Sequence, residues 1–311
     1  MIYLGFDTSN YTTSAAACGD TVCDIRKILT VKQGERGLRQ SDAVFQHMKN
    51  LPDLYSQLAE KNDLKNAAAI AVSTKPRNQE GSYMPVFLAG EGYARVISDT
   101  LGIPLLRLSH QDGHIMAGIE SCNAGNLLDK EFLALHLSGG TCEILVCHFE
   151  SPGFSCKIIG GTKDISAGQL IDRVGVAMGL SFPCGKELEQ IALTCEKHET
   201  LPSNTDGTYI NFSGIETKTL SLIEKKDNAI LAKGLFLAVA KSLYKALNQA
   251  VIQYGIKDIL VVGGVASNSI IREYLKNTLN AELFFSSPKM STDNACGIAG
   301  LCRLYYSQNR I

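Results

Sequence analysis

The chain has 311 residues, of which 45% are hydrophobic and 20% are charged, and its net charge is −1. This length and balance are typical of a soluble globular protein with two domains. Because the charge is nearly neutral, contact with a nucleic acid would need a local basic patch or a partner protein. No apolar run reaches about 18 residues, and the N-terminus lacks a secretion signal, so we expect no membrane partner.

Ten cysteines lie scattered through apolar segments, and none of them forms a Cys-x-x-Cys pair. This distribution favours small buried hydrophobic side chains in a reducing cytoplasm over a disulfide framework. It also argues against a zinc site built from thiolates. We therefore expect a cytoplasmic protein.

The first half of the chain opens on a strand, a polar turn and a returning strand. These are residues 2–7, 8–14 and 15–18, and Gly19-Asp20 then indicates a hairpin. Hydrophobic periodicity next predicts a helix over 42–58, a buried strand over 67–73, an amphipathic helix over 86–101, and a segment over 105–118 that contains two histidines.

The second half repeats this opening design. It begins with an apolar strand over 132–137, which is followed by the turn Ser138-Gly139-Gly140-Thr141 and a returning strand over 143–147. The pattern then predicts helices over 167–180, 232–254 and 294 to about 306, a buried strand over 259–262, and a loop over 194–206. Strands and helices alternate, so the class is α/β, and the repeat indicates two related lobes with β-β-β-α-type cores.

His110 and His114 are the most informative pair in the chain. Four residues apart on a helix, their imidazoles lie on one face, where a single divalent metal can bind both. On spacing alone, a pair that caps or packs remains an alternative. Asp293, just before the last predicted helix, could complete a His, His, Asp site or simply be the N-cap.

Two glycine turns could hold an anionic group. Ser138-Gly139-Gly140-Thr141 offers unobstructed backbone N–H groups, although a Gly-Gly turn is also an ordinary hairpin. Residues 263–268 connect a buried strand to a helix, which suits a nucleotide phosphate. The alternative is a tight connection in which Ser267 or Asn268 caps the helix.

Asp172 lies in a predicted helix and precedes the turn Pro183-Cys184-Gly185. Its carboxylate could hold ribose hydroxyls while the turn contacts the base. A solvated Asp172 beside Arg173 is the alternative.

These segments, in this order, resemble the universal tRNA threonylcarbamoyladenosine synthase family, formerly described as O-sialoglycoprotein endopeptidases. The resemblance covers nearly the whole chain. It rests on His110 to His114, Leu137 to Gly140, Asp164 to Gly185, Phe212 to Thr217, Val262 to Asn268 and Thr292 to Asn294.

The resemblance implies the fold of actin, hexokinase and the heat-shock ATPases. We place the first lobe at residues 1–105, with a C-terminal helix over about 294–311 packing back on it. The second lobe, 106–293, would hold both the metal and the nucleotide.

The resemblance also implies the ligands. A divalent Fe or Zn ion would be held by His110, His114 and Asp293. An adenine nucleotide or acyl-adenylate would be held by eight residues: His136, Leu137, Ser138, Gly139, Gly140, Asp172, Gly185 and Asn268.

The implied activity is transfer of a threonylcarbamoyl group from its adenylate to an adenosine of tRNA, with tRNA and the proteins of a threonylcarbamoylation complex as partners. A paralogue with related carbamoyl or acyl-adenylate chemistry belongs to the same hypothesis. The alternative is a catalytically altered nucleotide-binding scaffold or regulator of the same fold. A metallopeptidase is disfavoured because the chain has no His-Glu-x-x-His. No residue is assigned as catalytic.

The chain departs from the family at three places. The family's Glu-Thr-Ser-Cys-Asp-Glu-Thr is here Asp7 to Thr13, so Tyr11 and Thr12 replace two acidic residues. The segment 75–85 is longer and more charged, and Glu216 stands where the family has lysine. The metal and nucleotide positions are thus kept while one region of the first lobe is rebuilt.

Overall fold

The computed structural model describes residues 1–9, 11–31 and 38–308, and the chain forms two compact units. Unit 1 contains residues 1–129, 148–155 and the C-terminal segment from 289 onward. Unit 2 contains residues 130–147 and 156–288. Each unit is built on its own β-sheet, with its own buried core.

The sheet of unit 1 has the order β3-β2-β1-β4-β5. Its first three strands are antiparallel, and β4 and β5 run parallel to β1. The bounds are Ile2–Asp7 for β1, Thr12–Cys18 for β2, Val22–Ile28 for β3, Ala67–Lys75 for β4 and Leu105–Ser109 for β5.

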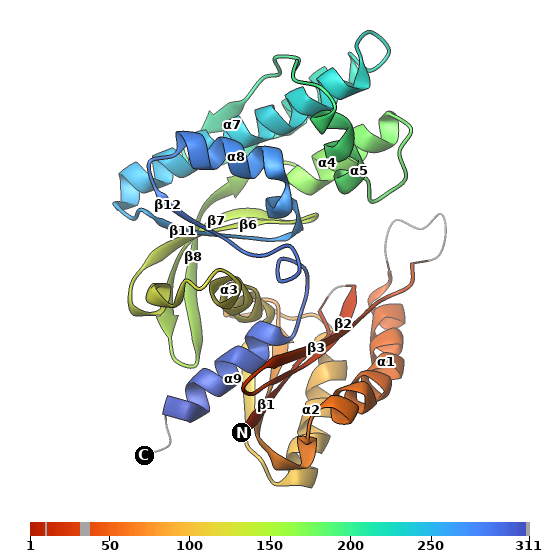
Figure 1. The fold of residues 1–311 in the computed structure, drawn as a ribbon, viewed down its shortest axis with the longest axis vertical. Helices are drawn as coiled ribbons and strands as arrows, with labels where there is room; N and C mark the ends of the chain where they lie inside the picture. Colours follow the sequence, from red (N-terminus) through yellow and green to blue (C-terminus); the bar gives the residue numbers. More distant parts are fainter. Residues whose placement is uncertain (10, 32–37, 309–311) are drawn as a thin grey trace. The chain divides into compact units, whose positions relative to one another are not determined.

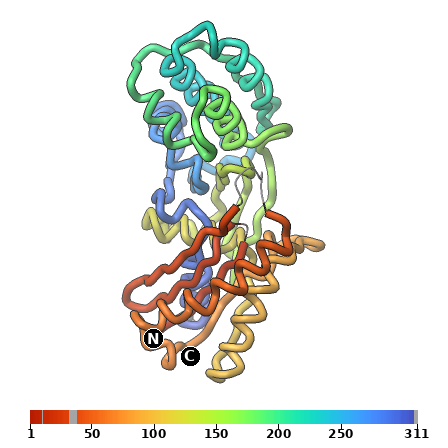
Figure 2. The backbone as a smooth tube through the Cα atoms, turned by 90° about the vertical axis from the view of Figure 1, so that its right-hand side faces the viewer, coloured from red at the N-terminus to blue at the C-terminus, as the bar shows by residue number. Residues whose placement is uncertain are grey.

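Helices cover both faces of this sheet, which explains why β1 is buried from Tyr3 to Asp7. Leu4 and Phe6 belong to the core beneath α1 (Gln40–Lys61) and α2 (Phe87–Leu101), which lie side by side (Figure 2). Side chains alternate along a strand, so Gly5 faces the other way. A Cβ on Gly5 would come 2.6 Å from the Ala295 carbonyl oxygen, so α9 (Cys296–Gln308) packs on that face. Asp7 shares the face of Gly5.

The sheet of unit 2 repeats that of unit 1 and extends it. Its order is β12-β11-β6-β7-β8-β10-β9, so β8-β7-β6-β11-β12 corresponds strand by strand to β3-β2-β1-β4-β5. The bounds are Phe132–Leu137 for β6, Cys142–Glu150 for β7, Gly153–Thr162 for β8, Asn204–Asp206 for β9, Tyr209–Asn211 for β10, Asp258–Val262 for β11 and Glu282–Phe285 for β12. The repeated strand order confirms the duplicated β-β-β-α-type core.

Five helices complete unit 2. They are α4 (Ala167–Ala177), α5 (Gly185–Leu193), α6 (Ser213–Leu220), α7 (Asn228–Tyr254) and α8 (Ser269–Thr278). Helix α7 packs against α5 and α8 and supplies much of the core (Figure 1). Its side chains are apolar on several faces because it is buried between the other helices and the sheet.

Several predicted boundaries differ from the observed ones. β2 begins at Thr12, so the polar turn before it is shorter than expected. α4 ends at Ala177 because Gly179, at a φ of 92°, lies in the left-handed region beyond it. Residues 204–206, expected to be loop, form β9, which pairs with β10. Neither β10 nor its other neighbour β8 was predicted.

The predicted lobe boundary at residue 105 differs from the division into units. Helix α3 (His110–Ser121) packs against α9 and the β4–β5 edge, so residues 106–129 belong to unit 1. Asp293 also lies in unit 1, together with His110 and His114. The predicted metal ligands are therefore in unit 1, and the predicted nucleotide residues in unit 2. No linker composition marks this division, and two of its four crossings, at 147/148 and 155/156, lie within strands β7 and β8.

Cysteines Cys18, Cys142, Cys147, Cys296 and Cys302 are buried, and none of the ten cysteines forms a disulfide in the structure. Burial of these five in apolar surroundings is what their sequence context predicts. Within the part of the chain that the structure describes, no helix has the length and hydropathy needed to cross a membrane.

Candidate metal and nucleotide sites

The two histidines stand in the first two turns of α3. Ser109 and Asp112 begin this helix with a capping box, in which each side chain accepts the other residue's backbone N–H. His110 is therefore the first helical residue, and His114 lies one turn further along the same face. Their ring centroids are 4.3 Å apart.

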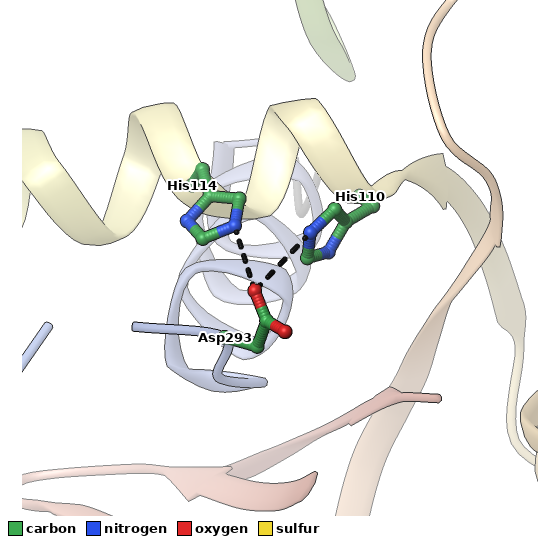
Figure 3. Close-up of side chains that lie close together, drawn as sticks. All are labelled: His110, His114 and Asp293. Carbon is green, nitrogen blue, oxygen red and sulfur yellow. Dashed lines mark ion pairs between the residues drawn. The ribbon is translucent and has the colours of Figure 1, made fainter. Parts of the chain in front are cut away.

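Asp293 approaches both imidazoles from the segment that precedes α9 (Figure 3). Its Oδ1 lies 3.2 Å from Nε2 of His114 and 3.6 Å from Nε2 of His110. Asn294, rather than Asp293, takes the capping role, because its Oδ1 accepts the Cys296 backbone N–H at 3.0 Å. The Asp293 carboxylate is thus directed toward the histidines.

These three side chains have the donor set and spacing of a metal site. One ligand atom from each residue lies within 4.8 Å of the others. Ligands about 2.1 Å from a tetrahedral metal are separated by roughly 3.4 Å, close to the spacings between Asp293 and the two imidazoles. Two imidazole nitrogens and a carboxylate oxygen suit Zn or non-haem Fe. The residues present therefore fit the implied group.

Asp7, at the end of β1, supports His110 from its other ring nitrogen. Both carboxylate oxygens of Asp7 lie 3.2 Å from Nδ1 of His110. Asp7 is fully buried and also accepts the hydroxyls of Ser9 and Ser73. Hydrogen bonding at Nδ1 leaves Nε2 directed at Asp293, the arrangement in which a carboxylate orients a metal-binding histidine.

The proximity of Asp7 and His110 shifts both of their pKa values. Burial by itself would raise the pKa of Asp7, but the charge of His110 and hydrogen bonds from His110, Ser73 and Ser9 lower it to about 2. Burial by itself would lower the pKa of His110, but Asp7, with a further contribution from Asp293, raises it to about 9. Without a metal, His110 is therefore protonated at neutral pH.

Arg26 on β3 fastens the segment that carries Asp293. Its guanidinium pairs with Asp24 at 2.7 Å and donates hydrogen bonds to the carbonyl oxygens of Lys289 and Asp293 and to the Thr292 hydroxyl. Because these bonds hold the backbone on both sides of Thr292, Arg26 restricts where the Asp293 carboxylate can lie.

Helix α9 crosses α3 at Gly297, where no side chain fits. A Cβ there would come 2.0 Å from the Gly113 carbonyl oxygen. We expect Gly297→Ala to lower the free energy of unfolding by about 1–3 kcal/mol, because the helices must separate to admit the methyl group. Denaturant unfolding followed by circular dichroism measures this change.

Gly92 provides the matched control within α2. A Cβ on Gly92 would meet no heavy atom within 4 Å. Gly92→Ala is therefore expected to raise the free energy of unfolding by about 0.5–1 kcal/mol through helix propensity. Equal effects of the two substitutions would contradict the close helix crossing.

Asp112 joins three segments of unit 1 at the start of α3. Besides capping the helix, its carboxylate accepts the side-chain N–H of Asn78 and the backbone N–H of Phe154, at 2.8–3.0 Å. It is buried, and a Cβ on Gly153 would contact it at 2.9 Å. Asn78, in the segment that departs from the family, thus helps to hold the histidine helix in place.

In unit 2, the first glycine turn lies between β6 and β7. The Ser138 hydroxyl accepts the Thr141 backbone N–H at 3.0 Å, and Ser166, the N-cap of α4, donates to the Gly139 carbonyl at 2.5 Å. A Cβ on Gly168 would come 2.4 Å from Gly139 Cα, whereas Gly139 and Gly140 are exposed and border open space. The turn is fixed on one side and accessible on the other.

The second glycine turn lies directly beside the first, because β11 and β6 are parallel neighbours. Gly263 adopts a φ of 100°, and a Cβ on it would come 2.3 Å from the Leu137 carbonyl oxygen. His136, at the same sheet edge, pairs in register with Val262. The carboxyl ends of adjacent parallel strands are where α/β folds bind ligands.

Asn268 and Asp172 both have structural partners. Asn268 caps α8 by accepting the Ile271 backbone N–H at 3.0 Å. Asp172 accepts the Cys184 backbone N–H at 2.9 Å, so it fastens the turn that leads into Gly185 and α5. Asp172 is therefore half-buried and hydrogen-bonded, and the neighbouring Arg173 pairs with Glu216 at 3.3 Å.

The first departure from the family lies at the start of β2. Tyr11 is 44% exposed, and Thr12 is the first residue of the strand. Asn10, the third substituted position, lies outside the described residues. Behind the turn, the buried Thr13 hydroxyl contacts Nδ1 of His47 at 2.9 Å. The acidic residues are thus replaced at the start of a strand whose next two residues, Thr13 and Ser14, are polar and buried.

Sequence reasoning missed the supporting residues of the metal cluster. Asp7 stands out only as part of the Asp7 to Thr13 motif, and no predicted site includes Arg26 or Gly297. A polar residue at the end of an apolar strand could have indicated Asp7. No local pattern indicates the other two, since their partners lie far along the chain.

A family model described as tRNA N6-adenosine threonylcarbamoyltransferase matches residues 16–300. Three relatives carry the same description. The chain is 29% identical to that of Chlamydia felis, over 97% of this chain and 91% of the relative. It is 27% identical to that of Chlorobium phaeovibrioides (99% and 95%) and 29% identical to one from Thermus thermophilus (96% and 91%).

Solved structures share the fold at low sequence identity. The activator of 2-hydroxyisocaproyl-CoA dehydratase from Clostridium difficile, with bound ADPNP, has a TM-score of 0.57 at 15% identity, covering 100% of this chain and 98% of that one. Full-length HypF has a TM-score of 0.61 at 14% identity, covering 97% and 46%. A glucokinase from Streptomyces griseus has a TM-score of 0.54 at 11% identity, covering 99% and 100%. The predicted kinase and ATPase fold is confirmed.

Proposed function

Because the chain belongs to the tRNA N6-adenosine threonylcarbamoyltransferase family, we propose that it transfers a threonylcarbamoyl group from threonylcarbamoyl-adenylate to an adenosine of tRNA. The enzymes of this family are transferases. The observation that carries the proposal is the convergence of His110, His114 and Asp293, with Asp7 behind His110.

The metal of this proposal is one divalent Fe or Zn ion held by His110, His114 and Asp293. When bound, such an ion supplies Lewis acidity toward an acyl oxygen of the substrate. Asp7 holds the His110 ring with Nε2 toward Asp293. The chain itself contributes ligands in fixed positions. The capping box positions the helix that carries both histidines, and Arg26 holds the segment that carries Asp293.

The nucleotide of this proposal binds in unit 2. The exposed Gly139 and Gly140 present backbone N–H groups to an adenylate phosphate, with His136, Leu137 and Ser138 forming the strand end that leads to them. Gly185 would approach the nucleoside, with its turn fastened by Asp172. Asn268 contributes by capping the helix after the second glycine turn, whose N-terminus favours negative charge.

Transfer requires tRNA as acceptor, and we propose that partner proteins of a threonylcarbamoylation complex contribute to tRNA binding. The net charge of −1 favours such help, because affinity for nucleic acid rests largely on cationic contacts to phosphate. A cytoplasmic location follows from this substrate.

The direct test is incubation of the purified protein with threonylcarbamoyl-adenylate and unmodified tRNA, with and without candidate partner proteins. Mass spectrometry of the digested tRNA is expected to detect threonylcarbamoyladenosine. A variant with both His110 and His114 changed to alanine serves as the inactive control. Absence of the modified nucleoside in every combination would contradict the proposal.

A second candidate is a nucleotide-binding scaffold or regulator, and the replacement of two family acidic residues by Tyr11 and Thr12 favours it. Restoring both acids distinguishes the two functions. If the protein is a scaffold, we expect it to bind an adenine nucleotide but to transfer no threonylcarbamoyl group until Tyr11→Asp and Thr12→Glu are introduced together. Equal transfer before and after this change supports the transferase.

Metal binding is expected to release a proton at neutral pH. Since the pKa of His110 is about 9 without metal, its Nε2 must lose a proton before it can act as a ligand. The deprotonation of His110 alone should make the apparent affinity for the metal rise about tenfold per pH unit below pH 9 and stay constant above it. Calorimetry in buffers of different ionisation enthalpy measures the proton count, and no release at pH 7 would refute the assignment.

A further inference from the structure

Two cysteine side chains meet between adjacent strands of unit 2. The Sγ atoms of Cys147 on β7 and Cys156 on β8 are 3.1 Å apart. Cys147 is buried, whereas Cys156 is partly exposed. No disulfide joins them in the structure. Neither residue belongs to the candidate metal or nucleotide sites.

The local backbone brings these two residues directly opposite each other. β7 and β8 are hydrogen-bonded neighbours, and only residues 151 and 152 connect them, so the strands run antiparallel. Cys147 lies as far before the connection as Cys156 lies after it. Residues opposite one another in such a pair have Cα atoms about 4.5–5.5 Å apart, within the range that a disulfide spans.

We propose that Cys147 and Cys156 form a reversible disulfide, so that this hairpin is a redox-sensitive modification site. The oxidant is a low-molecular-weight disulfide such as oxidised glutathione. The accessible Cys156 thiolate attacks it, giving a mixed disulfide and releasing one reduced glutathione. The Cys147 thiolate then attacks the Cys156 sulfur, forming the Cys147–Cys156 bond and releasing the second glutathione. Each protein thiol loses its proton, and the two cysteines are oxidised as one glutathione disulfide is reduced.

The bond would close the base of a hairpin whose tip has a structural role. The tip belongs to unit 1, where the Phe154 backbone N–H donates to the Asp112 carboxylate at 2.8 Å. Asp112 in turn caps the helix that begins at His110. A covalent link between the strands limits their separation, so oxidation slows local opening of the hairpin.

The test equilibrates the full-length protein in glutathione redox buffers, blocks the remaining thiols with an alkylating reagent, and digests it under non-reducing conditions. Cleavage after Glu143, Glu150 and Lys157 leaves Cys147 and Cys156 in separate peptides, apart from Cys142. The expected product is a linked pair whose mass is about 2 Da below the sum of the two free peptides and which reducing agent separates. In the same samples, amide exchange at Phe154 is expected to be slower after oxidation.

Cys156→Ser removes the bond while changing a partly exposed side chain, and Cys147→Ser tests the buried partner. Cys195→Ser is the matched control, since Cys195 is also partly exposed but lies outside these strands. The linked peptides are expected in the wild type and in the Cys195→Ser variant, and in neither of the others. Three outcomes would each overturn the proposal: a glutathione adduct on Cys156 as the sole product, a link from either residue to another cysteine, or no reaction in the most oxidising buffer.

Discussion

The double variant His110→Ala, His114→Ala is expected to purify without metal, whereas the wild type should carry about one equivalent of Fe or Zn per chain. Two of the three ligands are lost, and Asp293 alone is a weak site. Elemental analysis of the purified proteins measures the metal content, and the tRNA assay should show loss of transfer in the same variant.

The design of this experiment must separate ligand loss from unfolding. His110→Ala leaves the buried Asp7 without its ionic partner, which is expected to destabilise the protein. Asp293→Ala keeps both histidines and changes a side chain that is 21% exposed, so it tests the site with less disturbance. His148→Ala is the control, because this imidazole is 46% exposed and lies outside the cluster. Wild-type metal content in the folded double variant would refute the site.

Asp7→Asn is expected to weaken metal affinity about 10–100-fold, the cost typical of losing a carboxylate that orients a metal-bound histidine. Asparagine preserves the shape of the side chain, and its Oδ1 can accept one of the two serine hydroxyls while its Nδ2 donates to the other. It removes the negative charge that holds the His110 ring in place. Competition with a chromophoric chelator above pH 9, where a proton on His110 no longer competes with the metal in either protein, measures the affinity.

Asp20→Asn provides the charge-matched control, since Asp20 lies in the exposed turn between β2 and β3. The metal affinity of the Asp20→Asn variant should equal that of the wild type. If Asp7→Asn also retained full affinity while folding normally, Asp7 would have no positioning role, and the metal cluster would rest on His110, His114 and Asp293 alone.

The Asp7 substitution also changes the expected pH dependence. Loss of the carboxylate removes the main cause of the raised pKa of His110, so its pKa should move back toward that of an ordinary buried histidine. The number of protons released per bound metal ion at pH 7 would then be lower than in the wild type. Weaker binding with reduced proton release distinguishes the loss of Asp7 from general damage to the site.

Much of the fold follows from local patterns. The repeated strand-turn-strand units, the α/β class and the long helices are confirmed because hydrophobic periodicity and turn residues act over a few positions. The boundaries shifted where a local cap decided them, as at Gly179 after α4. The division into units was not predictable, because it depends on which sheet α3 packs against.

The sequence by itself determined the class of fold, the pairing of His110 with His114 on one helical face, and Asp293 as the third candidate ligand. Only the tertiary structure decided that Asp293 leaves the capping role to Asn294 and turns toward the histidines. It alone placed Asp7, 103 residues from His110 in sequence, behind the imidazole. The physical reason is that helix and strand periodicity is encoded locally, whereas the orientation of a ligand depends on contacts between β1, α3 and α9 that form only when the chain folds.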